Sequence, residues 1–126
     1  MANTAIVSDK APAALGPYSS GIKSGNVIHL SGMLGIDPAT GEYAGSDVVS
    51  QTHQALTNIR NVLAEVDATM ANVADVTVLL ADIADFAAMN EVYATYFAEP
   101  FPARCCYAVA ALPAGARVEI KSVAYL

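Results

Sequence analysis

The sequence predicts a single-domain α+β fold, in which two helices cover one face of a mixed sheet. Three observations support this prediction. The chain has 126 residues, a common length for one domain. Two segments place apolar residues at helical spacing, and several shorter segments show the apolar patterns of strands. No repeat, linker or low-complexity block divides the sequence, so we expect one domain over residues 1–126.

The first third of the chain predicts turns and one clear strand. GPYSSG at 16–21 contains a glycine and a proline that predict a chain corner. The segment NVIHLSGML at 26–34 alternates along its whole length, which places Ser31 and Met33 on the same face of a strand. The sequence DPATGE at 37–42 then predicts a turn.

Two predicted helices flank an apolar strand in the middle of the chain. Residues 46–66 form an apolar stripe at spacings of three and four, which predicts the first helix. Residues 73–81 are apolar almost throughout, which indicates a central strand. Residues 85–98 predict the second helix, and Asp82 provides a capping carboxylate before it. Asn90 falls on the apolar face of this helix, where a buried amide either holds a loop or lines a pocket.

The last quarter of the chain predicts two strands joined by a turn. The first strand lies within FPARCCYAVAALPAG at 101–115, and its odd positions, Cys105 among them, suit the buried face. Its even positions then put Arg104 and Cys106 on the opposite face. Residues 116–126 form the final strand, and a short turn would let the two strands pair directly.

The composition indicates that part of the surface is buried against another chain. Hydrophobic residues make up 55% of the sequence and charged residues 14%, against about 25% charged residues in soluble domains. Two helices leave one face of the sheet uncovered, and a small monomer has limited room to bury apolar surface. Because we assign apolar residues to the uncovered face, we expect a closed ring of subunits. An alanine-rich monomer is the alternative.

Charge and cysteine content limit the partners and the location that we expect. The formal net charge is −6 and no run of Lys or Arg occurs, so we expect no nucleic-acid partner. No apolar run approaches the length of a membrane span, and the N-terminal segment lacks the apolar centre of a secretory signal. The two cysteines are adjacent, a spacing unsuited to a disulfide between them. We therefore expect no membrane partner and a reducing, cytoplasmic location.

Arg104 is the residue whose placement most needs an explanation. A guanidinium in an apolar wall is costly unless an anion meets it. Glu119 in the next strand offers one answer, a buried salt bridge. In the other answer, Arg104 binds a ligand carboxylate in bidentate geometry while Glu119 faces the reacting carbon as an acid or base. The second arrangement suits small 2-oxo acids or their imines.

Five segments together carry a family resemblance. They are APAALGPYSSGI at 11–22, VIHLSGMLGIDPATGE at 27–42, QALTNIRNVL at 54–63, DFAAMNEVYATYF at 85–97 and PARCCYAVAALPAGARVEI at 102–120. In this order they span essentially the whole chain. Together they give the chain a resemblance to the RidA family, also called the YjgF family of reactive-intermediate imine deaminases. Met33 is a departure, because the family often has glutamine there.

The resemblance implies a homotrimer of chorismate-mutase-like subunits around a central barrel, with active sites between subunits. It implies hydrolysis of 2-iminobutanoate, 2-iminopropanoate and their enamine tautomers to 2-oxo acids and ammonia, without a cofactor or a metal. The family's carboxylate-binding arginine falls on Arg104 and its acidic residue on Glu119, which are the implied catalytic residues. The implied substrate-binding residues are Tyr18, Ser31, Gly32, Arg104 and Cys106.

Three other functions use the same residues differently. A thiol mechanism at Cys106 would need a base, and the only histidines are His29 and His53. A non-catalytic trimeric module that binds 2-oxo acids or regulates a partner would use the same carboxylate clamp. An endoribonuclease activity, ascribed to some family members, is disfavoured by the acidic charge.

Overall fold

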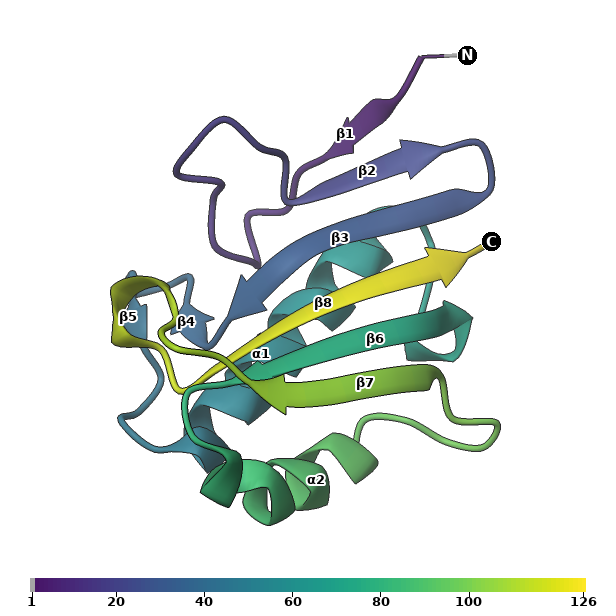
Figure 1. Cartoon of the computed structure of the whole chain (residues 1–126). Helices are drawn as coiled ribbons and strands as arrows, with labels where there is room; N and C mark the ends of the chain where they lie inside the picture. Colours follow the sequence, from purple (N-terminus) through teal and green to yellow (C-terminus); the bar gives the residue numbers. More distant parts are fainter. Residues whose placement is uncertain (1) are drawn as a thin grey trace.

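The computed structural model describes residues 2–126, which form a six-stranded sheet with the order β1-β2-β3-β8-β6-β7 (Figure 1). Neighbouring strands are antiparallel except β6 and β7, which are parallel, so the sheet is mixed as predicted. A separate two-stranded sheet joins β4 and β5. The strands are β1 (Thr4–Ile6), β2 (Gly21–Ser24), β3 (Val27–Leu34), β4 (Ile36–Asp37), β5 (Glu42–Tyr43), β6 (Val73–Leu80), β7 (Ala103–Ala108) and β8 (Val118–Tyr125).

Both predicted helices form on the same face of the sheet; in Figure 1 the first lies behind the strands and the second lies below β7. The first, α1 (Val48–Ala64), packs across β3 and β8 and also contacts the second, α2 (Phe86–Ala94). Asp47 caps α1, since its carboxylate accepts a hydrogen bond of 2.9 Å from the Ser50 backbone N–H. The predicted two-helix layer on one side of the sheet is therefore confirmed.

The core lies between α1 and the central strands. Val118, Ile120 and Ala124 of β8 are at most 1% exposed, which confirms the alternation predicted for the last strand. Leu56 and Ile59 of α1 meet the same core and are equally buried. Removing one large apolar side chain from water contributes about 1.5–3 kcal/mol, so these contacts fix α1 against the sheet.

A β-bulge in β3 changes which of its side chains face the core. Leu30 lies opposite Ser122 and Met33 opposite Ile120, so three steps along β3 match two along β8. The prediction that Ser31 and Met33 share a face is wrong, because the extra residue shifts the alternation. Met33 is 5% exposed and joins the core, whereas Ser31 stays half-buried.

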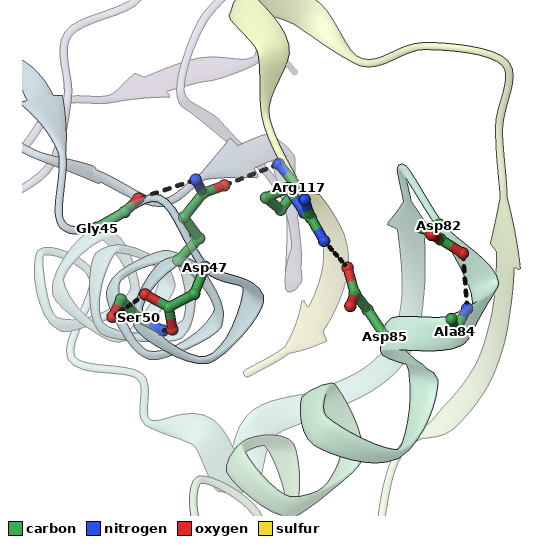
Figure 2. A network of polar contacts seen from close by, with 8 residues as sticks. Gly45, Asp47, Ser50, Asp82, Ala84, Asp85 and Arg117 are labelled. Atoms are coloured by element: carbon green, nitrogen blue, oxygen red, sulfur yellow. Dashed lines mark hydrogen bonds and ion pairs between the residues drawn. The ribbon is translucent and has the colours of Figure 1, made fainter.

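A chain of polar contacts ties α1 to the beginnings of β8 and α2 (Figure 2). The buried side chain of Gln51 donates to the Gly45 carbonyl at 2.9 Å and accepts from the Arg117 N–H at 2.8 Å. The Arg117 guanidinium pairs with Asp85 at 2.7 Å. The predicted cap at Asp82 is also present, as its carboxylate accepts from the Ala84 N–H at 2.9 Å.

Strand β7 differs from its prediction in both pairing and orientation. It pairs with β6 and not with β8, because β6 lies between them. The helix α2 connects β6 to β7, and such a crossover makes the two strands parallel neighbours. The faces are also reversed: Cys105 is exposed, while Arg104 and Cys106 are half-buried on the side that carries α2.

The sheet face opposite the helices keeps large apolar side chains exposed. Tyr107 of β7 and Tyr125 of β8 are 51% and 52% exposed. This surface is consistent with the expected contact between subunits. Within residues 2–126, no helix has the length and apolar character needed to cross a membrane.

Candidate active site

A groove of about 950 Å³ brings together four of the predicted site residues. The N-terminal segment 7–20 forms one wall, and the bulged end of β3 with the loop after it forms another. Ligand sites of small molecules usually have this concave, mainly apolar form with a few polar groups. The four predicted residues that line the groove are Tyr18, Ser31, Gly32 and Glu119. A second hollow of about 570 Å³, between α1 and the segment after α2, contains none of the predicted residues.

Glu119 projects from β8 into this groove and rests against Gly32. Any Cβ at position 32 would overlap the Oε2 atom of Glu119, so glycine makes the room that the carboxylate occupies. Burial raises the pKa of Glu119 above that of an ordinary glutamate. A carboxyl group with a raised pKa exchanges protons more readily near neutral pH, as a general acid or base must.

Ser31 and Tyr18 hold the wall of the groove through short-range contacts. The Ser31 hydroxyl donates to the Ser19 carbonyl at 2.6 Å, and the Ser31 N–H donates to the Ser20 carbonyl at 3.0 Å. These bonds fix the segment that carries Tyr18 against the bulge in β3. The Tyr18 ring is 53% exposed at the groove, where it is free to contact a ligand.

Arg104 lies in a different place, between β7 and α2. Its Nη1 donates to the Asn90 Oδ1 at 2.7 Å. Its Cζ lies 4.7 Å from the centroid of the Tyr93 ring and 5.6 Å from that of the Phe86 ring. Cation–π contact with two rings and one hydrogen bond orient the guanidinium, while its other N–H groups stay available to an anion.

Cys106 shares the Arg104 side of β7 but is not an activated thiol. Burial raises the pKa of Cys106, and the nearby Arg104 charge offsets only part of this effect. A reactive cysteine needs the opposite shift. Among the described hydrogen bonds, His53 pairs with the Tyr96 hydroxyl at 3.0 Å, and neither histidine contacts Cys106. The geometry therefore disfavours the thiol mechanism.

The two predicted catalytic residues do not meet within one chain. Glu119 faces the groove on the uncovered side of the sheet, whereas Arg104 faces α2, and β6 separates their strands. Among residues 2–126 the single ion pair within 4.0 Å joins Arg117 to Asp85. The buried Arg104–Glu119 salt bridge is therefore wrong, because it assumed direct pairing of β7 with β8.

Sequence reasoning missed the residues that support Arg104. Asn90 was recognised as an amide on an apolar helix face, and the structure shows that it accepts a hydrogen bond from Arg104. Tyr93 is 6% exposed in the core, and its ring also lies against the Arg104 guanidinium. Lys121 was not singled out, although it lines the groove beside Glu119. In the part of the chain that the structure describes, no cluster of three His, Cys, Asp or Glu side chains suits a metal ion.

Comparisons with known proteins agree over almost the whole chain. Residues 8–126 match the family described as Endoribonuclease L-PSP. A Capra hircus protein named 2-iminobutanoate/2-iminopropanoate deaminase is 51% identical over 94% of this chain and 87% of its own length. The crystal structure of RidA from the Antarctic bacterium Psychrobacter sp. PAMC 21119 has a TM-score of 0.94 at 41% identity, covering 98% of this chain and 99% of that one.

A further solved structure carries a ligand. TdcF from E. coli with bound serine has a TM-score of 0.92 at 33% identity, and 98% of each chain is covered. The resemblance found in the sequence is thus confirmed by an independent family match, by curated relatives and by shared folds. This chain belongs to the Endoribonuclease L-PSP family, which includes the RidA and YjgF proteins.

Proposed function

We propose that this protein is a 2-iminobutanoate/2-iminopropanoate deaminase, which converts 2-imino acids and their enamine tautomers to 2-oxo acids and ammonia. The observation that carries the proposal is the position of the Glu119 carboxylate, which lies over Gly32 in the groove and has a raised pKa. It occurs in a chain that is 51% identical to a protein of that name. A general acid or base in a small-molecule groove is what imine hydrolysis requires.

The complete site forms between two subunits of a homotrimer. Arg104 and Glu119 lie on different sides of one protomer. A head-to-tail contact that closes into a ring brings one side of each protomer against the other side of its neighbour. Every site then receives Arg104 from one subunit and Glu119 from the next, and the uncovered sheet faces line a central barrel.

In the reaction, Arg104 binds the substrate carboxylate through paired hydrogen bonds and fixes the position of the C=N carbon. Glu119 takes a proton from water as the water oxygen bonds to that carbon, and the imine nitrogen receives a proton. The resulting carbinolamine passes its hydroxyl proton to nitrogen through the same carboxylate. The C–N bond then breaks, which releases ammonia and the 2-oxo acid. An enamine first gains a proton at C3 and loses one at nitrogen.

The remaining site residues shape the cavity around the reacting carbon. The backbones at Gly32 and Cys106 lie against the substrate, and Ser31 keeps the bulge of β3 in place through its bond to Ser19. Tyr18 covers the groove from the N-terminal segment. No step needs a cofactor, since water and one carboxylate account for all transferred atoms. The expected cytoplasmic location and the lack of a nucleic-acid partner stay predictions.

The direct test is the rate of 2-oxo acid formation from 2-iminobutanoate generated in situ by an excess of an amino-acid oxidase. The spontaneous rate is subtracted. Loss of two charge-assisted hydrogen bonds costs about 3 kcal/mol, so Arg104→Ala should lower kcat/KM about 100-fold. The matched control is Arg60→Ala, because Arg60 lies outside the groove and away from Arg104. An unchanged rate in Arg104→Ala, or no acceleration by the wild type, would contradict the proposal.

The shared site has its own test by subunit mixing. Arg104→Ala and Glu119→Gln proteins should each have strongly reduced activity, and their mixture should regain activity after unfolding and refolding together. In a random mixture about a quarter of the interfaces pair an intact Arg104 with an intact Glu119. No recovery in the mixture, or a solution mass of one 13.0-kDa chain, would overturn the shared site.

A further inference from the structure

Lys121 is a cation in the groove to which the proposed reaction gives no role. It lies two residues after Glu119 on β8, and it is the only Lys or Arg among the residues that line the groove. Its side chain is exposed, and its Nζ donates to the Leu30 carbonyl at 3.2 Å. Within residues 2–126 it makes no ion pair with the two groove carboxylates, Asp9 and Glu119.

Glu119 and Lys121 extend across the same part of β3. The Glu119 carboxylate rests on Gly32, and the Lys121 ammonium rests on the Leu30 carbonyl. Two residues along a strand span about 6–7 Å, so the two side chains leave β8 on the same face at about that spacing. Of the two contact points, Gly32 lines the groove, and Leu30 directly precedes the lining residue Ser31.

This separation fits a substrate with a second carboxylate. When Glu119 faces the C=N carbon, three carbon–carbon bonds and one charge-assisted hydrogen bond reach about 6–7 Å from that carbon. A five-carbon 2-imino dicarboxylate therefore has the length to bring its distal carboxylate to the Lys121 Nζ. Two of the three N–H donors of Lys121 are free of the Leu30 contact and available to that carboxylate.

We propose that Lys121 is a specificity-determining residue, which binds the side-chain carboxylate of 2-imino dicarboxylates such as 2-iminoglutarate. The inference rests on the proposed function and extends its substrate class from small apolar side chains to acidic ones. The chemistry at the C=N bond is the same: water adds, the C–N bond breaks, and the products are 2-oxoglutarate and ammonia. The distal carboxylate takes no part in bond making and only positions the substrate.

The test compares two substrates in one series of variants. The kcat/KM ratio of 2-iminoglutarate to 2-iminobutanoate is measured with imines generated in situ by the corresponding oxidases. Lys121→Met keeps the length of the side chain and removes its charge, and it should lower this ratio about tenfold. Lys121→Arg should restore most of the ratio. Lys23→Met, which removes an exposed lysine outside the groove, should leave it unchanged.

A binding measurement separates this inference from the proposed function. Calorimetric Kd values for 2-oxoglutarate and 2-oxobutanoate need no turnover, and Lys121→Met should weaken 2-oxoglutarate about tenfold relative to 2-oxobutanoate. If the wild type accelerates no imine but the Kd ratio still depends on Lys121, the deaminase proposal fails and the carboxylate subsite stands. If the wild type hydrolyses 2-iminobutanoate and neither ratio responds to Lys121→Met, the inference is overturned.

Discussion

Gly32→Ala tests whether the position of the Glu119 carboxylate matters for catalysis. The added Cβ overlaps Oε2 of Glu119, so the carboxylate has to move by about 1 Å to restore ordinary contact. A displacement of this size typically costs about 100-fold in rate when the group must meet a reacting atom. Glu119 is a surface-accessible side chain that can swing into the groove, so the free energy of unfolding should change by about 1 kcal/mol or less.

The assay is kcat for 2-iminobutanoate together with urea unfolding of the same preparations. Gly25→Ala is the matched control, because Gly25 has φ 60° and no atom within 4 Å of an added Cβ. It should lose about 1–2 kcal/mol of stability from the left-handed backbone and keep its kcat. In a Glu119→Gln background, Gly32→Ala should have little further effect on the rate. Wild-type kcat in Gly32→Ala would refute a positioned carboxylate.

Four other predictions concern Glu119, Gln51 and Asn90. The raised pKa of Glu119 means that the ionised carboxylate costs stability, a cost that disappears as pH falls through that pKa; Glu119→Gln should therefore raise the Tm at pH 7 and not at pH 4. For the same reason the acid limb of kcat/KM should lie above the ordinary glutamate pKa of about 4.3. Gln51→Ala leaves two partly buried backbone groups without their partner and should cost about 1–2 kcal/mol in urea unfolding, with Gln54→Ala as the milder control. Asn90→Ala should raise KM about tenfold with a smaller change in kcat, because Asn90 acts only through the orientation of Arg104; an equal fall in kcat would contradict that role.

The helices and strands were easier to predict from the sequence than the pairing of the strands. Hydrophobic periodicity placed both helices and the last strand, since burial of an apolar stripe decides these segments locally. The place of β7 depended on the crossover through α2, which pairs it with β6 before β8 is reached. The bulge in β3 left no pattern of its own, because a single extra residue reads as continued alternation.

In the candidate site, the groove residues were predictable from the sequence and the contacts of Arg104 were not. The family resemblance selected Tyr18, Ser31, Gly32 and Glu119, and the structure brings these four to one groove. The orientation of Arg104 was not predictable from alternation, because its favourable partners are aromatic rings and an amide on α2, the helix that precedes β7 in the chain. Contacts of this kind depend on tertiary packing and leave no local signal.

Strand β7 ends the sheet, and one of its edges therefore has no neighbouring strand among residues 2–126. Open backbone donors and acceptors beside exposed Cys105 and Tyr107 form a template on which further chains can aggregate. In the proposed trimer, the contact that delivers Arg104 to the next subunit would also shield this template. Selection for catalysis and selection against aggregation would then act on the same few residues, and a variant that weakens assembly should lose solubility together with activity.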